Sequence, residues 1–294
     1  KNLHLAYFLQ LNFLNWIFLM LLEQTVSEHY ANTDLLEKIY DGLGKLGIDK
    51  DKLTQSDLSS VDEFHIGGPE GTLMLAEKLS INASSSVLDI GCGIGGPARL
   101  LSSKIGCKVS GIDLTADFVN TGNSLTEQVG LSGSVKLIEA SALNIPFADN
   151  SFDVSYMIHV GMNIADKDVL FSEAFRVTKP GGLFGIYDVM LVRNCELQYP
   201  LPWAVEKDGS AIASAADYKS ALIKAGFSLR HEEDKTDFAN GFFEKMSVNM
   251  GSSKGPPPIG LHLLMGDFTK AKIRNMAQLI KSEIIAPKIL ILEK

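Results

Sequence analysis

Residues 87–96 have the sequence Val-Leu-Asp-Ile-Gly-Cys-Gly-Ile-Gly-Gly, in which a short apolar run and one acid are followed by alternating glycines. The next five residues, Pro-Ala-Arg-Leu-Leu at 97–101, are typical of a helix with proline in its first turn. Glycine lets a backbone approach a ligand closely and adopt φ values that a Cβ would forbid. The stretch therefore predicts a strand, a tight loop and a helix, the first unit of a nucleotide-binding α/β sheet.

Two acids near this loop indicate which nucleotide ligand it takes. Asp113 lies twenty-two residues after Gly91, at the end of a second predicted strand, where a carboxylate can accept both hydroxyls of a ribose. Asp89, just before the first glycine, would repel a pyrophosphate but attract a cation. S-adenosylmethionine carries a sulfonium and an ammonium and no phosphate, so the acid favours it over a dinucleotide. A structural acid that bonds loop amides is the alternative role for Asp89.

The chain resembles the class I S-adenosylmethionine-dependent methyltransferases of the small-molecule type. Besides the glycine loop, the resemblance rests on the stretches His65-Ile66-Gly67-Gly68, Glu139-Ala140-Ser141-Ala142, Ile145 to Val154, and Lys179-Pro180-Gly181-Gly182. The first of these resembles the segment before the core of enzymes that act on glycine, sarcosine, dimethylglycine, phosphoethanolamine or tocopherol precursors. The resemblance covers roughly residues 60–190 and implies a Rossmann-like, doubly wound sheet of seven strands.

The loop and the resemblance together predict the residues that bind S-adenosylmethionine. These residues are Asp89, Gly91, Gly93, Gly95, Asp113, Leu114, Ser141, Ala142 and His159. No metal-ligand cluster is visible in the sequence, and methyl transfer from a sulfonium requires none.

The chain divides into five predicted segments around this core. These are an apolar N-terminal segment (1–22), an N-terminal helical lid (23–80), the cofactor-binding α/β core (81–234), a helical cap insertion (235–283) and the closing strand of the core (284–294). Strands are expected over 86–91, 108–113, 135–140, 152–159, 182–189, 227–233 and 284–293, and core helices over 96–105, 115–129, 166–178 and 214–225.

Composition excludes some partners. The 294 residues carry a net charge of −8 without a basic block, which excludes polyanionic nucleic acid. Three cysteines at irregular spacing suggest neither a disulfide framework nor zinc, so we expect a cytoplasmic location. Residues 3–22 are apolar enough to span a bilayer, but Gln10, Asn12 and Asn15 interrupt them. We favour a packed helix or a homodimer interface there over membrane contact, and an N-terminal anchor stays open.

His159 is the leading catalytic candidate, because it ends the fourth predicted strand, where open α/β sheets bind ligands. It would act as a general base or only line the pocket. Asp188, at the end of the fifth strand, would bind a substrate ammonium, orient the histidine or cap the following loop. Tyr30 resembles the tyrosine of an N-terminal helix that closes over the methyl group in related enzymes. Asn163 and Tyr187 are candidate substrate contacts.

Three further substrate contacts are predicted, each with core packing as the alternative. His65 precedes two glycines and could touch the methionine part of the cofactor or the substrate. Trp203 follows a proline-rich loop and could hold a methylated cation by cation–π attraction. His262 lies in the cap insertion.

The predicted function is methyl transfer from S-adenosylmethionine to a small-molecule nucleophile, with an amine nitrogen as the first choice. The alternative is C- or O-methylation of a phenolic or sterol-like lipid, for which the apolar segment 259–265 leaves room. A nicotinamide-dependent oxidoreductase is the alternative from another class, and Asp89 and the turn at 179–182 disfavour it. The intact glycine loop with Asp113 disfavours a non-catalytic binding protein.

Overall fold

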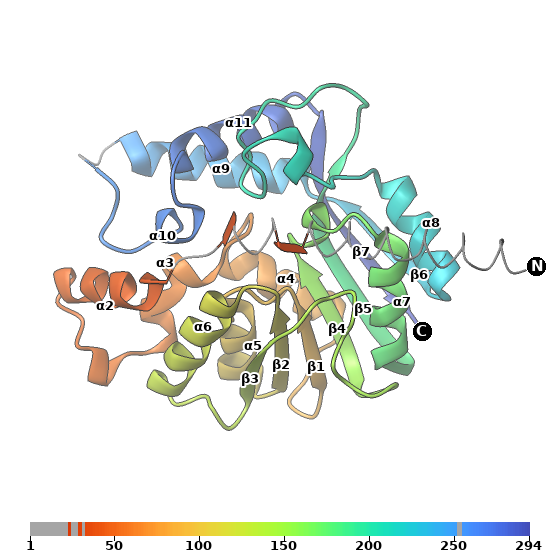
Figure 1. The fold of residues 1–294 in the computed structure, drawn as a ribbon, viewed down its shortest axis with the longest axis horizontal. Coiled ribbons are helices and arrows are strands. Elements are labelled where there is room, and N and C mark those ends of the chain that lie inside the picture. The colour runs from red at the N-terminus through yellow and green to blue at the C-terminus, as the bar shows by residue number, and fades with distance from the viewer. Residues whose placement is uncertain (1–22, 25–28, 31–32, 252–254) are drawn as a thin grey trace, which may run out of the picture.

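The computed structural model describes residues 23–24, 29–30, 33–251 and 255–294 (Figure 1). The predictions for residues 1–22 lie outside this part. In the described part, seven strands form one sheet in the order β3-β2-β1-β4-β5-β7-β6. The strands are β1 (Ser86–Ile90), β2 (Lys108–Asp113), β3 (Val135–Glu139), β4 (Phe152–Ile158), β5 (Thr178–Leu191), β6 (Ser228–Asp234) and β7 (Ile285–Glu293).

Helices cover both faces of this sheet. The α-helices whose bounds the structure gives are α2 (Leu35–Lys45), α3 (Ser59–Asp62), α4 (Pro69–Lys78), α5 (Gly96–Ile105), α6 (Ala116–Gln128), α7 (Lys167–Val177), α8 (Ala215–Ala225), α9 (Thr236–Gly251), α10 (His262–Met265) and α11 (Thr269–Lys281). No helix among the described residues is long and apolar enough to cross a membrane.

The two faces are packed by alternating residues of the same strands, as period-2 side-chain geometry requires. On one face, α7 and α8 pack on residues such as Leu88 and Phe184. On the other face, α4, α5 and α6 pack on residues such as Val87 and Tyr187. The predicted doubly wound, seven-stranded α/β fold is confirmed by this arrangement.

The fifth strand differs from its predicted bounds. We expected a helix to 178 and a turn at 179–182, but β5 begins at Thr178, directly after α7. Thr178 pairs with Phe152 of β4, and regular pairing resumes only at Leu183 with Val154, across an irregular stretch. The lysine-proline-glycine-glycine sequence therefore forms an irregular first part of the strand, where glycine and proline weaken the ladder.

The last two strands form the expected antiparallel pair, with helices α9, α10 and α11 inserted between them. In Figure 1 this cap lies above the sheet, and the N-terminal helix α2 lies beside α10. The carboxyl ends of β1, β2 and β4 face the cap, so the fold places inserted helices over the sheet edge where ligands bind in such folds.

Candidate active site

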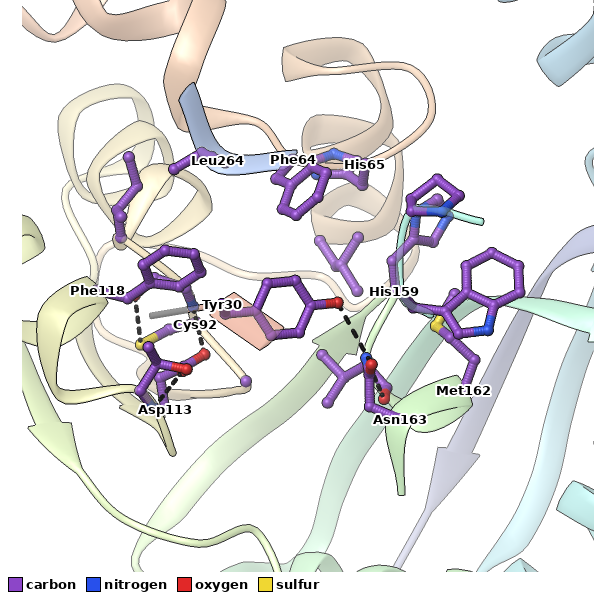
Figure 2. A pocket seen from close by; sticks show the side chains of 18 of the residues that line it. Tyr30, Phe64, His65, Cys92, Asp113, Phe118, His159, Met162, Asn163 and Leu264 are labelled. Carbon is purple, nitrogen blue, oxygen red and sulfur yellow. Dashed lines mark hydrogen bonds between the residues drawn. The ribbon is translucent and has the colours of Figure 1, made fainter. Parts of the chain in front are cut away.

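A large cavity lies between the strand ends and the cap (Figure 2), with about 1630 Å³ of empty space counted out to its open mouth. Its strand side, as we call it, comes from residues of the core, including Asp89, Gly93, Asp113 and His159. Its cap side consists of apolar residues from the inserted segments. They are Pro202, Trp203, Phe242, Phe243, Met246, Leu261, Leu264, Met265, Ile273 and Met276.

The glycine loop forms a cradle on the strand side. Gly91 and Gly93 have φ values of +75° and +54°, which side chains other than glycine rarely adopt. A Cβ on Gly91 would lie 2.5 Å from Cγ2 of Val160, whereas a Cβ on Gly93 would meet no protein atom within 4 Å. Since Gly93 lines the cavity, a side chain there would fill space that a ligand can use.

Gly95 has a different role from the predicted cofactor contact. It does not line the cavity, and a Cβ on Gly95 would lie 2.6 Å from the side chain of Leu137 on β3. This glycine therefore lets the first turn of α5 pack closely on the sheet.

Asp113 lies at the end of β2, as predicted, and lines the cavity. Its Oδ2 accepts a hydrogen bond from the Gly93 amide at 2.8 Å, and its Oδ1 accepts one from the Thr115 amide at 2.9 Å. A carboxylate has about four acceptor positions, so two remain for the hydroxyls of a ribose. Leu114, the next predicted contact, also lines the cavity. These residues fit the ribose of S-adenosylmethionine.

Asp89 is 2% exposed and accepts a hydrogen bond from the Tyr156 hydroxyl at 2.9 Å, not from loop amides. Burial raises the pKa of Asp89 to about 7, although the bond from Tyr156 acts in the opposite direction. A cation in the cavity would favour the charged form of this carboxyl group. The cationic methionine end of S-adenosylmethionine therefore fits beside Asp89.

The end of β3 lies along a small apolar part of the cavity. Ala140, Ala142 and Leu143 line it, as the position of Ala142 in the motif predicts. Ser141 does not line it, because its hydroxyl bonds to Glu23 and accepts the Leu143 amide at 3.0 Å. Ser141 thus stabilises this turn and is not among the residues that line the cavity.

His159 directly follows β4 and lines the cavity. It has a φ of +55°, and its amide donates to the Tyr187 carbonyl at 2.8 Å. Its Nε2 is buried and has no hydrogen-bond partner among the described residues. Burial, and secondarily the charge of His65, lower the pKa of His159 well below its ordinary value of 6.5. The imidazole is therefore neutral near pH 7, with an Nε2 that no described residue occupies.

His65 also lines the cavity, and its ring centroid lies 6.0 Å from that of His159. Its Nε2 lies 3.0 Å from the Gly68 carbonyl and 3.2 Å from the Thr72 hydroxyl. Burial lowers the pKa of His65 to about 4. These bonds are local, to the residue before α4 and to the first turn of α4, and they fix the orientation of the His65 ring at the cavity.

Tyr30 and Asn163 meet within the cavity, as Figure 2 shows. The Tyr30 hydroxyl donates to Oδ1 of Asn163 at 3.3 Å, and the ring centroids of Tyr30 and Phe118 are 5.8 Å apart. Burial raises the pKa of Tyr30. A neutral phenol from the predicted N-terminal lid (residues 23–80) therefore lies across the predicted catalytic region.

Asp188 and Tyr187 do not line the cavity, so neither is placed as a direct substrate contact. Asp188 is 0% exposed, does not line the cavity, and accepts bonds from the amides of Val160 and Gly161 and from the Tyr218 hydroxyl. It fixes the loop after His159 instead of binding substrate. Tyr187 is fully buried, with its ring 5.1 Å from that of His159, so it supports the histidine from behind.

The cap contributes more than the sequence motifs predict. Trp203 lines the cavity as expected, with its Nε1 donating to the Ser210 hydroxyl at 2.9 Å. His262 does not line it, because α10 presents Leu264 and Met265 there instead. The apolar residues of α9 and α11 were missed, since at helical spacing they are indistinguishable from ordinary core residues.

The described residues that line the cavity include four acids and no lysine or arginine. All four acids come from the core or from the predicted N-terminal lid (residues 23–80), and each already has a hydrogen-bond or ion-pair partner. Asp62 pairs with Arg99, Glu23 with Ser141, Asp89 with Tyr156 and Asp113 with loop amides. Among the described residues, no cluster of histidine, cysteine or acids could hold a metal ion.

Comparison with known proteins agrees with this geometry. The family described as a methyltransferase domain matches residues 88–186. A sterol 24-C-methyltransferase of Gibberella zeae is 30% identical over 223 residues, which are 73% of this chain and 59% of that protein. One from Aspergillus fumigatus is 32% identical over 169 residues, 55% of this chain and 45% of that protein. The chain thus spans about half the length of the curated relatives it matches.

Solved structures share the fold at low sequence identity. Geranyl diphosphate C-methyltransferase from Streptomyces coelicolor has a TM-score of 0.62 and 18% identity, over 76% of this chain and 78% of that one. Phosphoethanolamine N-methyltransferase 2 of Haemonchus contortus has a TM-score of 0.66 and 18% identity, over 82% and 57%. Residues 88–186 therefore match the methyltransferase-domain family, and the sheet order and the glycine loop with its acids agree with the class I S-adenosylmethionine-dependent methyltransferases that the sequence resembles.

Proposed function

We propose that this protein transfers the methyl group of S-adenosylmethionine to a neutral, apolar acceptor of the lipid-like kind, such as a sterol or a phenolic lipid. One observation carries the proposal. The cap side of the cavity is built from aromatic, methionine and aliphatic side chains, and no lysine or arginine lies among the described lining residues. Such a wall favours an acceptor that gains by leaving water.

Acceptors with other chemistry match this cavity less well. A phosphate group is usually bound by arginine or lysine, which the described lining lacks. An amine, our first choice from the sequence, would be held best by an acid that the cofactor does not use, but Asp89 and Asp113 are assigned to the cofactor, Asp62 pairs with Arg99 and Glu23 bonds to Ser141. The sterol 24-C-methyltransferases among the relatives support the lipid alternative, whereas phosphoethanolamine methyltransferases share only the fold.

When bound, S-adenosylmethionine supplies a methyl group activated by its sulfonium. The chain then has two tasks: to hold the acceptor in line with that methyl group and to exclude water. Tyr30, Phe64 and Phe118 line the cavity near the strand side as a cluster of rings, with the Tyr30 centroid 6.3 Å from that of Phe64 and 5.8 Å from that of Phe118, so this part of the wall is apolar. The cap side aligns the body of the acceptor.

An acceptor that gains a methyl group on carbon or on a hydroxyl oxygen loses one proton. His159 is placed to accept it at Nε2, in the tautomer that carries its proton on Nδ1. Its lowered pKa keeps the imidazole unprotonated before transfer. Asp188 accepts hydrogen bonds from two amides of the loop after His159. Through these bonds it holds the backbone directly after His159 in place.

A cytoplasmic location belongs to the same proposal. Its support is that all three cysteines are free, with Cys92 and Cys107 buried and Cys195 exposed. A small-molecule acceptor as the partner is likewise proposed, while the homodimer stays a prediction.

Transfer of a labelled methyl group tests the proposal. The protein is incubated with methyl-labelled S-adenosylmethionine and, separately, with sterols, phenolic lipids, primary amines and phosphorylated acceptors. We expect label in an organic-extractable product from a neutral lipid, and less label from the Asp113→Ala variant when S-adenosylmethionine is below saturation. Label only in amines or phosphorylated acceptors would overturn the acceptor class. Calorimetric binding of a nicotinamide dinucleotide without binding of S-adenosylmethionine would overturn the reaction.

A further inference from the structure

A buried ion pair joins the predicted N-terminal lid (residues 23–80) to the core beside the cavity. Nη2 of Arg99 lies 2.5 Å from Oδ1 of Asp62, and its Nε lies 3.3 Å from Oδ2. Both side chains are 0% exposed. A two-point contact between guanidinium and carboxylate fixes the direction of both groups as well as their distance.

The same guanidinium also holds the cofactor loop. Nη1 of Arg99 donates to the carbonyl of Ile94 at 2.7 Å, to that of Gly122 at 3.1 Å and to the Thr126 hydroxyl at 3.1 Å. Ile94 lies within the glycine loop and lines the cavity. Arg99 therefore links the glycine loop, helix α6 and Asp62 through one rigid group.

Asp62 carries this link into the segment that closes the cavity. It ends α3, and the residues shortly after it, 64–66, all line the cavity. Its backbone also lies directly on α5, since a Cβ on Gly96 would come within 1.9 Å of the Asp62 carbonyl oxygen. Only glycine at 96 permits this approach, so Asp62 touches the core through its backbone and its side chain.

We propose that Asp62 and Arg99 are a pair of positioning residues that set the affinity for the cofactor by holding the glycine loop and residues 64–66 in register. Neither residue needs to touch the reacting atoms. The pair acts through the Ile94 carbonyl on one side and the segment that contains His65 on the other. This inference rests on the proposed use of S-adenosylmethionine.

The energetics of buried ion pairs define the test. Removing one partner leaves a buried charge without compensation, which destabilises any protein regardless of function. Replacing both partners by apolar groups of similar size removes that penalty and is often neutral for stability. The double variant Asp62→Leu with Arg99→Met therefore separates a purely structural pair from a positioning pair. The conservative variant Arg99→Lys keeps the charge but loses the fork that reaches several acceptors.

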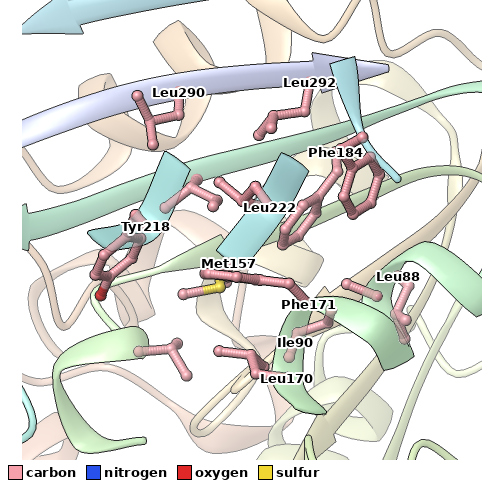
Figure 3. Packing of buried hydrophobic residues seen from close by; sticks show 14 of the residues in the cluster. Leu88, Ile90, Met157, Leu170, Phe171, Phe184, Tyr218, Leu222, Leu290 and Leu292 are labelled. Atoms are coloured by element: carbon pink, nitrogen blue, oxygen red, sulfur yellow. The ribbon is translucent and has the colours of Figure 1, made fainter. Parts of the chain in front are cut away.

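The experiment measures the dissociation constants of S-adenosylmethionine and S-adenosylhomocysteine by calorimetry, beside the unfolding temperature. We expect Arg99→Lys and the double variant to bind both ligands about tenfold more weakly, as for one lost hydrogen-bonded contact. The double variant should unfold between the temperature of the Arg99→Met single variant and that of wild type, because it leaves no buried charge unpaired but removes a donor from the Ile94 and Gly122 carbonyls. Leu222→Ala is the control, because Leu222 is fully buried between α8 and the sheet (Figure 3) and lies away from the cavity. It should lower the unfolding temperature and leave both constants unchanged.

Two results would overturn the inference. In one, the folded Arg99→Lys and double variants bind both ligands as tightly as wild type. In the other, Leu222→Ala weakens binding as much as they do, so that affinity follows stability. Failure of the wild-type protein to bind either ligand would instead contradict the proposed function. Faster hydrogen exchange at the amides of residues 64–66 in the ligand-free double variant is expected as a readout independent of ligand.

Discussion

The strand side and the cap side of the cavity differ in how they are built. The strand side consists of short loops at strand ends, where backbone amides, acids and a histidine are fixed by bonds to neighbouring strands. The cap side consists of apolar side chains from the loop after β5 and from helices α9 to α11 and their connections. Directional bonds suit a cofactor whose polar groups have fixed places, and an apolar wall suits an acceptor recognised by shape and by leaving water. Under the proposed function, cofactor and acceptor are therefore selected by separate parts of this chain.

The largest expected effect on the strand side is loss of the proposed base. His159→Ala should lower turnover by about a hundredfold or more, because no described side chain takes over proton removal at that position. The affinity for S-adenosylmethionine should stay near that of wild type. The exposed His231 of β6 provides the control, and His231→Ala should leave turnover unchanged. If His159→Ala turns over within a few-fold of wild type, the histidine lines the cavity but does not act as a base.

Asp113→Ala should weaken cofactor binding by about tenfold or more, because it removes charge-assisted bonds to the ribose and frees the Gly93 amide. The acceptor KM should change little at saturating cofactor. Asp153→Ala is a matched control, since Asp153 also accepts a backbone amide, that of Ser86, but does not line the cavity. An unchanged dissociation constant for Asp113→Ala, measured by calorimetry, would contradict the role of β2 in binding the cofactor.

A change on the cap side should have the opposite pattern. Met276→Gln keeps the length of the side chain but adds a polar group to the apolar wall, so the acceptor KM should rise roughly three- to tenfold. The cofactor dissociation constant should stay the same. Met276→Leu keeps the apolar wall and should leave both values near wild type. A loss of cofactor affinity equal to the rise in KM would mean that the two sides are not separate.

The smallest expected change is in the dependence of turnover on pH. Because the pKa of His159 is lowered well below 6.5, its basic form persists as the pH falls through neutrality. Turnover at saturating cofactor and acceptor should therefore stay level from about pH 6.5 to 8.5. An acidic limb with a midpoint near the pKa of a free imidazole would contradict the burial of this histidine.

The strand side could be predicted from sequence because its signals are local. The glycine loop, Asp113 and His159 each follow a strand of the sheet, so strand periodicity places them at one edge. The role of Asp188 could not be predicted in this way, because its partners belong to the neighbouring strand's loop and to α8. The strand β5 was predicted too short, since Pro180, Gly181 and Gly182 lie among its first five residues.

The cap side could not be predicted residue by residue. Met276 and Phe243 have the same helical spacing as any core residue, and only their tertiary position makes them part of a cavity. His262 shows the converse, because a polar residue in the insertion attracted a prediction that its orientation does not support. The pair of Asp62 and Arg99 joins residues 37 positions apart without a motif.

The structure of a ternary complex would test the division between the two sides most directly. Crystals would contain the protein, S-adenosylhomocysteine and the neutral acceptor identified by label transfer. We expect the acceptor to contact Phe243 and Met276, with its methyl-accepting atom facing His159, and the ribose to be held by Asp113. An acceptor bound outside the cap side, or anchored by an acid of the strand side, would contradict the division between the two sides.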